Sequence, residues 1–156
     1  MVKKNYQAEV GKASKTARAL MTNVPISIKY STEICNQIKG KQVNKAIEFL
    51  ERIYNHEEYL PLKRYHKKVG HRKGNALNGE KSGRYPELTV REFVNLLNLA
   101  KTNADFKGLD AEKLLIIHIF CGMGINRYSY QSKGKIAGKA RRRNSTNIEV
   151  IVQEMK

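Results

Sequence analysis

The feature that most constrains this chain is a window without acids, between Glu112 and Glu149, which carries eight Lys or Arg residues. Two short runs rich in branched apolar residues flank it, at positions 114–120 and 148–152. Such runs are typical of β-strands. Two strands joined by a long, wholly positive connection predict a hairpin arm, at about residues 121–147, that projects from the body. Because the arm cannot bury its own charges, we expect a large polyanion around it.

The overall charge balance points the same way. The 156 residues fit one domain, residues 1–156 with the arm included, and contain 30 basic and 14 acidic residues, a formal net charge of +16. A phosphate backbone would relieve the resulting self-repulsion by counterion release. A membrane surface is the weaker alternative, because the chain has no Trp and no helix with a basic face opposite a Trp/Phe/Leu face.

Cysteine usage and the termini indicate a soluble protein of a reducing compartment, which we expect to be the cytosol. Cys35 and Cys121 do not make a disulfide framework, and no histidine lies near either with zinc-ligand spacing. We therefore expect two ordinary semi-buried thiols, no metal site and no cofactor. The first residues lack the apolar stretch of a signal peptide, and the longest apolar run is too short to span a bilayer.

Three helices are predicted from apolar spacing. The clearest shows apolar residues that repeat at three and four positions from Val43 to Tyr54, and it ends before Pro61. A short helix is expected to follow a capping cluster at residues 31–33 and to end at Gly40. The third begins near Pro86, or at Thr89 with Glu92 as a capping box, and ends at Gly108.

The sequence predicts β-strands near both ends of the chain. Residues 6–10 suggest a short strand, and residues 11–20 are ambiguous. The apolar run at 114–120 and a final strand at 147–154 form the two limbs of the hairpin. Strands and helices together indicate an α+β fold.

A second basic segment lies between residues 60 and 85, where apolar periodicity disappears. It contains eight Lys or Arg residues and one acid, Glu80, with Tyr and His interleaved. A loop this long in a compact domain is usually functional or disordered. Lys and Arg reach phosphates, and Tyr and His stack on unpaired bases. The RNA-binding candidates here are Lys63, Arg64, Tyr65, His66, Lys67, Lys68, His71, Arg72 and Lys73.

The arm supplies a second set of RNA-binding candidates. They are Arg127, Lys133, Lys135, Lys139, Arg141, Arg142 and Arg143. Because the positive charge lies on loops and no recognition helix is visible, single-stranded or folded RNA is favoured over duplex DNA. A solvated basic surface is the plainer alternative for either segment taken alone.

No catalytic residues are predicted. His118 falls inside an apolar strand and is expected to be a packed, hydrogen-bonded core residue. His66 and His71 lie in a basic run, where they would be poor general bases. The acids are expected on helix faces as solubilising groups. No phosphate-binding glycine loop is present.

Several blocks in order resemble a known family. They are residues 26–29, 33–35 and 38–40; Pro61-Leu62-Lys63-Arg64-Tyr65 with Lys67-Lys68-Val69-Gly70-His71; Gly83-Arg84-Tyr85-Pro86; residues 103–110; and residues 147–150. Over nearly the whole chain they resemble the large-subunit ribosomal protein twenty-two family, of the archaeal and eukaryotic cytosolic type.

The resemblance implies a three-stranded antiparallel sheet packed on three helices in the order β-α-α-α-β-β, with the last two strands prolonged into a long basic hairpin. It implies binding to large-subunit ribosomal RNA, help in assembly, and a hairpin tip that lines the nascent-peptide exit tunnel. By position it adds Lys29 and Arg84 to the RNA-binding set, and it places four residues at the tunnel: Lys135, Ile136, Gly138 and Lys139. Implied partners are ribosomal RNA, neighbouring ribosomal proteins and the nascent polypeptide, in a cytoplasmic ribosome.

The chain departs from the family near the tip, where Lys135 and Lys139 stand in place of the usual Arg. Lysine offers a point charge where Arg offers a planar fork. Two other functions stay open from the sequence. One is a free-standing RNA-binding regulator or RNA chaperone, and the other is a small RNA-acting enzyme.

Overall fold

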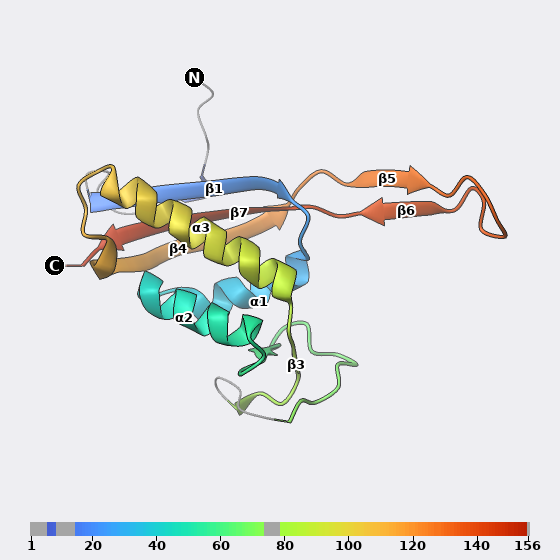
Figure 1. Cartoon of the computed structure of the whole chain (residues 1–156), viewed down its shortest axis with the longest axis horizontal. Coiled ribbons are helices and arrows are strands. Elements are labelled where there is room, and N and C mark those ends of the chain that lie inside the picture. The colour runs from blue at the N-terminus through green and yellow to red at the C-terminus, as the bar shows by residue number, and fades with distance from the viewer. Residues whose placement is uncertain (1–5, 9–14, 74–78, 156) are drawn as a thin grey trace, which may run out of the picture.

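A three-stranded antiparallel sheet forms the body of the protein in the computed structural model, which describes residues 6–8, 15–73 and 79–155. The strands are β1 (Thr16–Val24), β4 (Leu114–Met123) and β7 (Thr146–Glu154), in the order β1-β7-β4. The C-terminal strand β7 therefore lies in the middle, between elements from opposite ends of the chain (Figure 1). The predicted α+β fold is confirmed.

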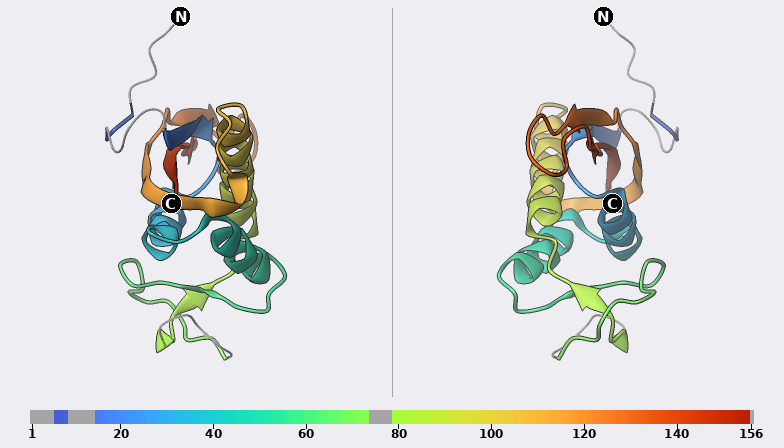
Figure 2. Two further views of the ribbon diagram at one scale, coloured as in Figure 1. Left: turned by 90° about the vertical axis from the view of Figure 1, so that its left-hand side faces the viewer. Right: turned by 90° about the vertical axis from the view of Figure 1, so that its right-hand side faces the viewer.

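Three helices pack on one side of this sheet. They are α1 (Ile28–Ile38), α2 (Val43–Tyr54) and α3 (Glu87–Asp105). Helix α3 packs along β1 and against α2, while α1 packs on β4. In the end-on views of Figure 2 the helices gather below and beside the sheet, and the loop that contains β3 (Gly83–Arg84) lies beyond α1 and α2.

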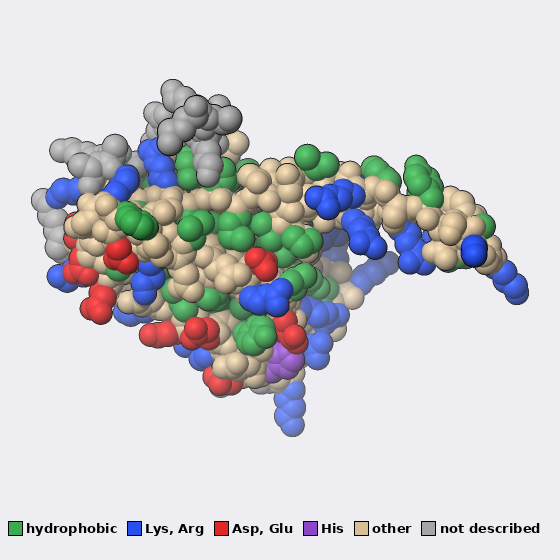
Figure 3. Space-filling model, turned by 45° about the horizontal axis from the view of Figure 1, so that its top comes forward, with side chains coloured by type: hydrophobic (Ala, Val, Ile, Leu, Met, Phe, Trp, Pro, Cys, Tyr) green, Lys and Arg blue, Asp and Glu red, His purple; other side chains and the backbone are tan. Residues whose placement is uncertain are grey.

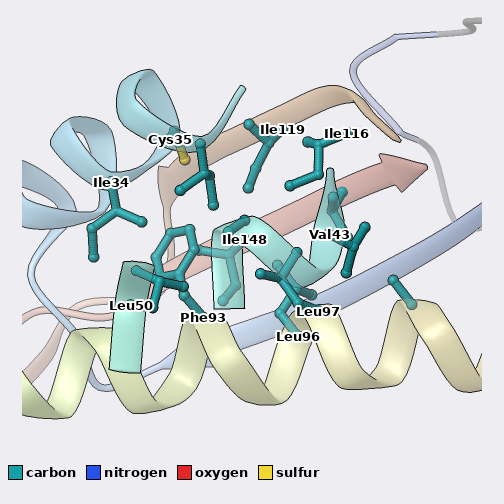
Figure 4. Packing of buried hydrophobic residues seen from close by; sticks show 14 of the residues in the cluster. Ile34, Cys35, Val43, Leu50, Phe93, Leu96, Leu97, Ile116, Ile119 and Ile148 are labelled. Atoms are coloured by element: carbon teal, nitrogen blue, oxygen red, sulfur yellow. The ribbon is translucent and has the colours of Figure 1, made fainter. Parts of the chain in front are cut away.

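The core lies between the sheet and the helices. Each helix contributes an apolar stripe, as Leu50 of α2 and Phe93 of α3 show by meeting Ile148 of β7 (Figure 4). All three side chains are fully buried. Burying each of these side chains contributes about 1.5–3 kcal/mol to the stability of the folded state. The helix predicted from the apolar repeat that begins at Val43 and ends before Pro61 is confirmed as α2.

The prediction for the first strand is wrong. Residues 6–8 form no strand, and residues 9–10 lie outside the described part of the chain. The strand is β1, which begins at Thr16, inside the segment that the sequence leaves ambiguous. Its register with β7 buries the small side chains of Ala17 and Ala19 under the helices. Small residues carry little strand signal, so only the pairing identifies them.

The start of α1 also differs from the prediction. The helix begins at Ile28, so the supposed capping cluster at residues 31–33 lies inside it. The Ser31 and Thr32 hydroxyls donate back to carbonyls one turn earlier, at 2.9 and 2.8 Å. This back-bonding competes with a capping role. For α3 the start near Pro86 is confirmed, and no side-chain cap is formed.

The predicted hairpin is confirmed. Beyond the sheet, β4 and β7 continue into a two-stranded ribbon of β5 (Arg127–Tyr130) and β6 (Ala140–Arg143). We call residues 124–145 the basic arm; it projects along the long axis of the molecule (Figure 1). Of the helices that the structure describes, none is long and apolar enough to cross a membrane.

Two acids are not the surface groups that the sequence suggests. Glu33 and Glu149 are buried, with 0% and 4% of their surface exposed. Nε2 of His118 lies 2.9 Å from a carboxylate oxygen of Glu149, which is hydrogen-bonding distance. The prediction that His118 is packed and hydrogen-bonded is therefore confirmed. The prediction that acids serve only as solubilising groups is therefore wrong at these positions.

The two thiols lie close to each other. Cys35 is buried in the core and Cys121 is half-buried on β4, with its sulfur 3.4 Å from the Thr32 hydroxyl. A hydrogen bond with Cys35 lowers the pKa of Cys121 to about 7, and the same bond and burial raise the pKa of Cys35.

Candidate nucleic-acid interface

The basic segment between α2 and α3 is held at both ends. Its first residues form β2 (Leu60–Pro61), which pairs with β3. An isolated bridge joins His71 to Ser82 farther out. We call residues 62–73 the basic loop. These pairings give the loop a defined path, which the sequence alone does not indicate.

A buried carboxylate fixes the inner part of the basic loop. Glu33, on α1, accepts hydrogen bonds from the backbone N–H groups of Arg64 and Tyr65 at 2.8 Å each. Its second oxygen accepts one from Lys63 at 3.2 Å. Charge-assisted bonds of this kind are about twice as strong as neutral ones. They turn the backbone inward, and the side chains of Lys63 and Arg64 remain exposed.

A hollow of about 370 Å³ opens beside this anchored turn. Its lining joins the first turn of α1 to the basic loop: Ser27, Lys29, Tyr30, Leu62, Arg64, Tyr65, Lys67 and Val69. Two cations lie over the Tyr65 ring, with Lys29 Nζ 5.8 Å and Arg64 Cζ 5.6 Å from its centroid. The fold thus brings Lys29 to the basic loop, although more than thirty residues separate them.

The remaining candidates of the basic loop point outward. His66, Lys67, Lys68, His71, Arg72 and Lys73 are all exposed. The Arg72 guanidinium lies 5.5 Å from the Tyr85 ring centroid, and that centroid lies 4.5 Å from the centroid of the His56 ring, with the two planes tilted by 35°. Arg84 is half-buried, and its guanidinium donates to the Gly83 carbonyl at 3.1 Å. Arg84 is thus partly engaged within the protein.

The arm candidates form a separate surface. Arg127, Arg141, Arg142 and Arg143 lie on the paired strands β5 and β6, and all four are exposed. Lys133, Lys135 and Lys139 surround the tip, where the Gly138 N–H donates to the Gln131 carbonyl at 2.7 Å. Gly134 and Gly138 have φ values of +86° and +78°, which favour glycine.

Polar side chains clasp the base of the arm. Asn23 accepts a hydrogen bond from the Ile125 N–H at 2.9 Å, and its own N–H donates to Asn147 at 2.8 Å. The Ser145 hydroxyl donates to the Ile125 carbonyl at 2.6 Å. We call Asn23, Gly124, Ile125, Ser145 and Asn147 the clasp. The sequence gives no signal for the clasp, because its members come from parts of the chain that are far apart.

The basic loop and the basic arm leave the same end of the body. Thr146, at the base of the arm, donates from its hydroxyl to the Ile26 carbonyl at 2.9 Å. Ile26 precedes Ser27 and Lys29, which line the hollow beside the basic loop. From this junction the arm extends along the long axis and the loop extends below the helices (Figure 1). The two sets of candidates therefore flank a common corner and are not one patch.

The exposed acids lie on the body and not on the arm. In Figure 3 the red side chains are spread over the body, and none is visible on the arm. Glu48, Glu51, Glu57, Glu87 and Asp105 are all exposed. Glu87 lies near the basic loop, because its carboxylate is 2.9 Å from Nε2 of His56, whose ring contacts Tyr85. Among the described residues there is no group of three or more His, Cys, Asp or Glu side chains that could hold a metal ion.

Fold and site together define a class of protein: a small α+β body with two cation-rich extensions. Comparison with known proteins agrees. The profile described as ribosomal protein L22p/L17e matches residues 19–153. The chain belongs to this family of ribosomal proteins, which are structural proteins and not enzymes.

Archaeal relatives match along almost their full length. The large ribosomal subunit protein uL22 of Ignicoccus hospitalis is 40% identical, with 97% of each chain covered. The protein of the same name from Methanocaldococcus jannaschii is 40% identical, over 99% of this chain and 97% of the relative. That from Archaeoglobus fulgidus is 34% identical, over 98% and 97%.

Proposed function

We propose that this protein is a structural component of the large ribosomal subunit in the cytoplasm and that it binds large-subunit ribosomal RNA. The basic arm is the observation that supports this most strongly. A two-stranded ribbon with no acid and with four exposed arginines has little apolar surface to hold it against its own protein. Phosphates on several sides would neutralise these charges and release counterions.

The basic loop is the second proposed RNA contact. Glu33 fixes its backbone, so Lys63, Arg64 and Lys67 are presented at lower entropic cost than side chains on a free loop. Tyr65 offers a ring face beside them. The same candidates, from Lys29 through Arg84, therefore form one proposed contact and the arm residues another.

The tip of the arm is proposed to line the nascent-peptide exit tunnel. Lys135, Ile136, Gly138 and Lys139 belong to the turn between β5 and β6. This turn is the part of the arm farthest from the body (Figure 1). Ile136 is 45% exposed there, although it is apolar. A thin ribbon that carries such a tip can reach between RNA helices where the body cannot.

A neighbouring ribosomal protein is proposed to cover the outer surface of α2 and α3. Acids lie there, which disfavours RNA, and a hollow of about 220 Å³ is lined by Glu51, Tyr54, Val90, Arg91 and Val94. Tyr54 is 49% exposed beside it. This mixed surface is typical of protein contacts more than of phosphate contacts.

The function can be tested with a photo-crosslinking amino acid in place of Ile136, expressed in cells and followed by sedimentation of the lysate in high magnesium. We expect the protein in the large subunit and, after irradiation of translating ribosomes, cross-links to nascent chains. The same amino acid at Tyr54 is the control, and it should not reach nascent chains.

The two parts of the proposal are tested separately by this design. Protein found mainly in the light, ribosome-free fractions would reject incorporation and favour a free-standing RNA-binding regulator. Incorporation with cross-links to RNA alone would reject the tunnel position of the tip and leave the RNA-binding role intact.

A further inference from the structure

The basic arm carries two aromatic rings that no part of the described chain covers. Tyr128 is 59% exposed and Tyr130 is 72% exposed. Both lie on β5, which begins with Arg127 and pairs with the arginines of β6. Large exposed rings on a ribbon that has no core of its own indicate a surface for a partner.

The register of the ribbon assigns these rings to one face. Tyr128 pairs with Arg142 and Tyr130 pairs with Ala140. Paired residues, and residues two apart on one strand, share a face of a sheet. We call this set the tyrosine face.

The opposite face has a different chemistry. Arg127 pairs with Arg143, and Ser129 pairs with Arg141. These four residues form the arginine face, which has three cations and no ring. Figure 3 agrees with this division, since hydrophobic side chains follow one edge of the arm and Lys and Arg the other.

The spacing of the rings suits flat ligands. Residues two apart on a strand are about 6.8 Å apart along it. Neighbouring stacked bases rise by about 3.4 Å, so one base fits between two such rings. Stacking on tyrosine accepts any base, because every base has a π-face.

We propose that the two faces of the basic arm read different parts of RNA, with Tyr128 and Tyr130 stacking on unpaired bases while Arg127, Arg141 and Arg143 contact phosphates. This rests on the proposed RNA-binding function. Charge favours RNA over a peptide on the tyrosine face, because Arg142 lies within it and the arm has no acid. An aromatic surface beside a cation suits a nucleotide, which combines a ring with a negative charge.

Tryptophan reporters test the proposal directly. The chain has no Trp, so Tyr128→Trp and Tyr130→Trp each place a single tryptophan on the tyrosine face, and it can be excited at wavelengths that tyrosine does not absorb. The probe is purified large-subunit ribosomal RNA. Stacking on bases should quench the emission several-fold at saturation, whereas the matched variant Ser129→Trp, on the arginine face, should change little.

A second measurement separates bases from phosphates. Replacing Tyr128 and Tyr130 with Leu keeps apolar bulk but removes the rings, and it should lower RNA affinity by about five- to a hundredfold for each ring without changing the salt dependence. Arg141→Ser with Arg143→Ser should instead flatten the salt dependence.

The outcomes distinguish this proposal from the function on which it rests. RNA binding with equal quenching at positions 128, 129 and 130, or with none, overturns the division into two faces and leaves RNA binding intact. Quenching only in ribosomes that carry nascent chains would assign the tyrosine face to peptide. Failure of every variant and of the parent protein to bind RNA would overturn the proposed function itself.

Discussion

Glu33 shows how one buried acid can organise a basic surface. It is fully buried, yet its carboxylate is satisfied by three backbone donors of the basic loop. A buried charge without partners is very unfavourable, so the loop and the acid depend on each other. The acid thus sets the position of Lys63 and Arg64 without any contact to the polyanion.

Glu33→Gln is predicted to loosen the basic loop. The amide oxygen can still accept from Arg64 and Tyr65, but the NH₂ group cannot accept from Lys63. One unsatisfied buried donor costs about 1–3 kcal/mol. We expect faster amide hydrogen exchange at residues 63–65 and weaker RNA binding. Glu51→Gln, on the exposed side of α2, is the control. Unchanged exchange at Lys63 would show that the carboxylate does not hold the loop.

At the scale of elements, the clasp determines how the basic arm leaves the sheet. Asn23 has a φ of +56°, which aims its side chain at Ile125, while its backbone meets Asn147. Side chains of Asn and Asp tolerate this left-handed conformation better than most. Three segments, from β1, β4 and β7, therefore meet at one point where the ladder between β4 and β7 ends.

Gly124→Ala is predicted to disturb the clasp. An added Cβ would lie 2.5 Å from the Ser145 hydroxyl and 2.8 Å from the Asn23 side-chain oxygen, so these groups must move. Overpacking of this kind costs about 1–3 kcal/mol. We expect a lower midpoint of thermal unfolding and faster exchange of the Ile125 amide. Gly70→Ala is the matched control, since an added Cβ there meets nothing within 4 Å. Equal effects of both substitutions would contradict a specific role for Gly124.

At the scale of the whole molecule, charge is divided between the body and the arm. The exposed acids of α2 and α3 lie on the body, and the arm that extends from it contains no acid. A protein of net charge +16 can therefore meet RNA with the arm and the basic loop while its acidic surface faces elsewhere. This division orients the molecule before any specific contact forms.

Changing Arg141, Arg142 and Arg143 to Ser together is predicted to lower RNA affinity and to reduce its salt slope by up to about three counterions. The control changes Lys45, Arg52 and Arg91, on α2 and α3, to Ser, which removes the same net charge. In filter-binding titrations across salt concentrations, the control should keep the slope of log affinity against log salt concentration. The same slope for both triple variants would show that only net charge matters.

The sequence by itself determined the features that are local. Apolar spacing predicted α2, the runs around the acid-free window predicted β4 and β7, and the distribution of Lys and Arg marked the basic loop and the arm. Periodicity and charge are properties of neighbouring residues, so they can be read without the fold.

Only the tertiary structure decided which distant residues act together. Glu33 reaches Tyr65 across 32 positions, and Asn23 reaches Ile125 across 102. The location of β1 and the two faces of the basic arm likewise follow from strand register, which a one-residue shift would reverse. The partners of these contacts lie far apart in the sequence and come together only when the chain folds. No short stretch of sequence contains both of them.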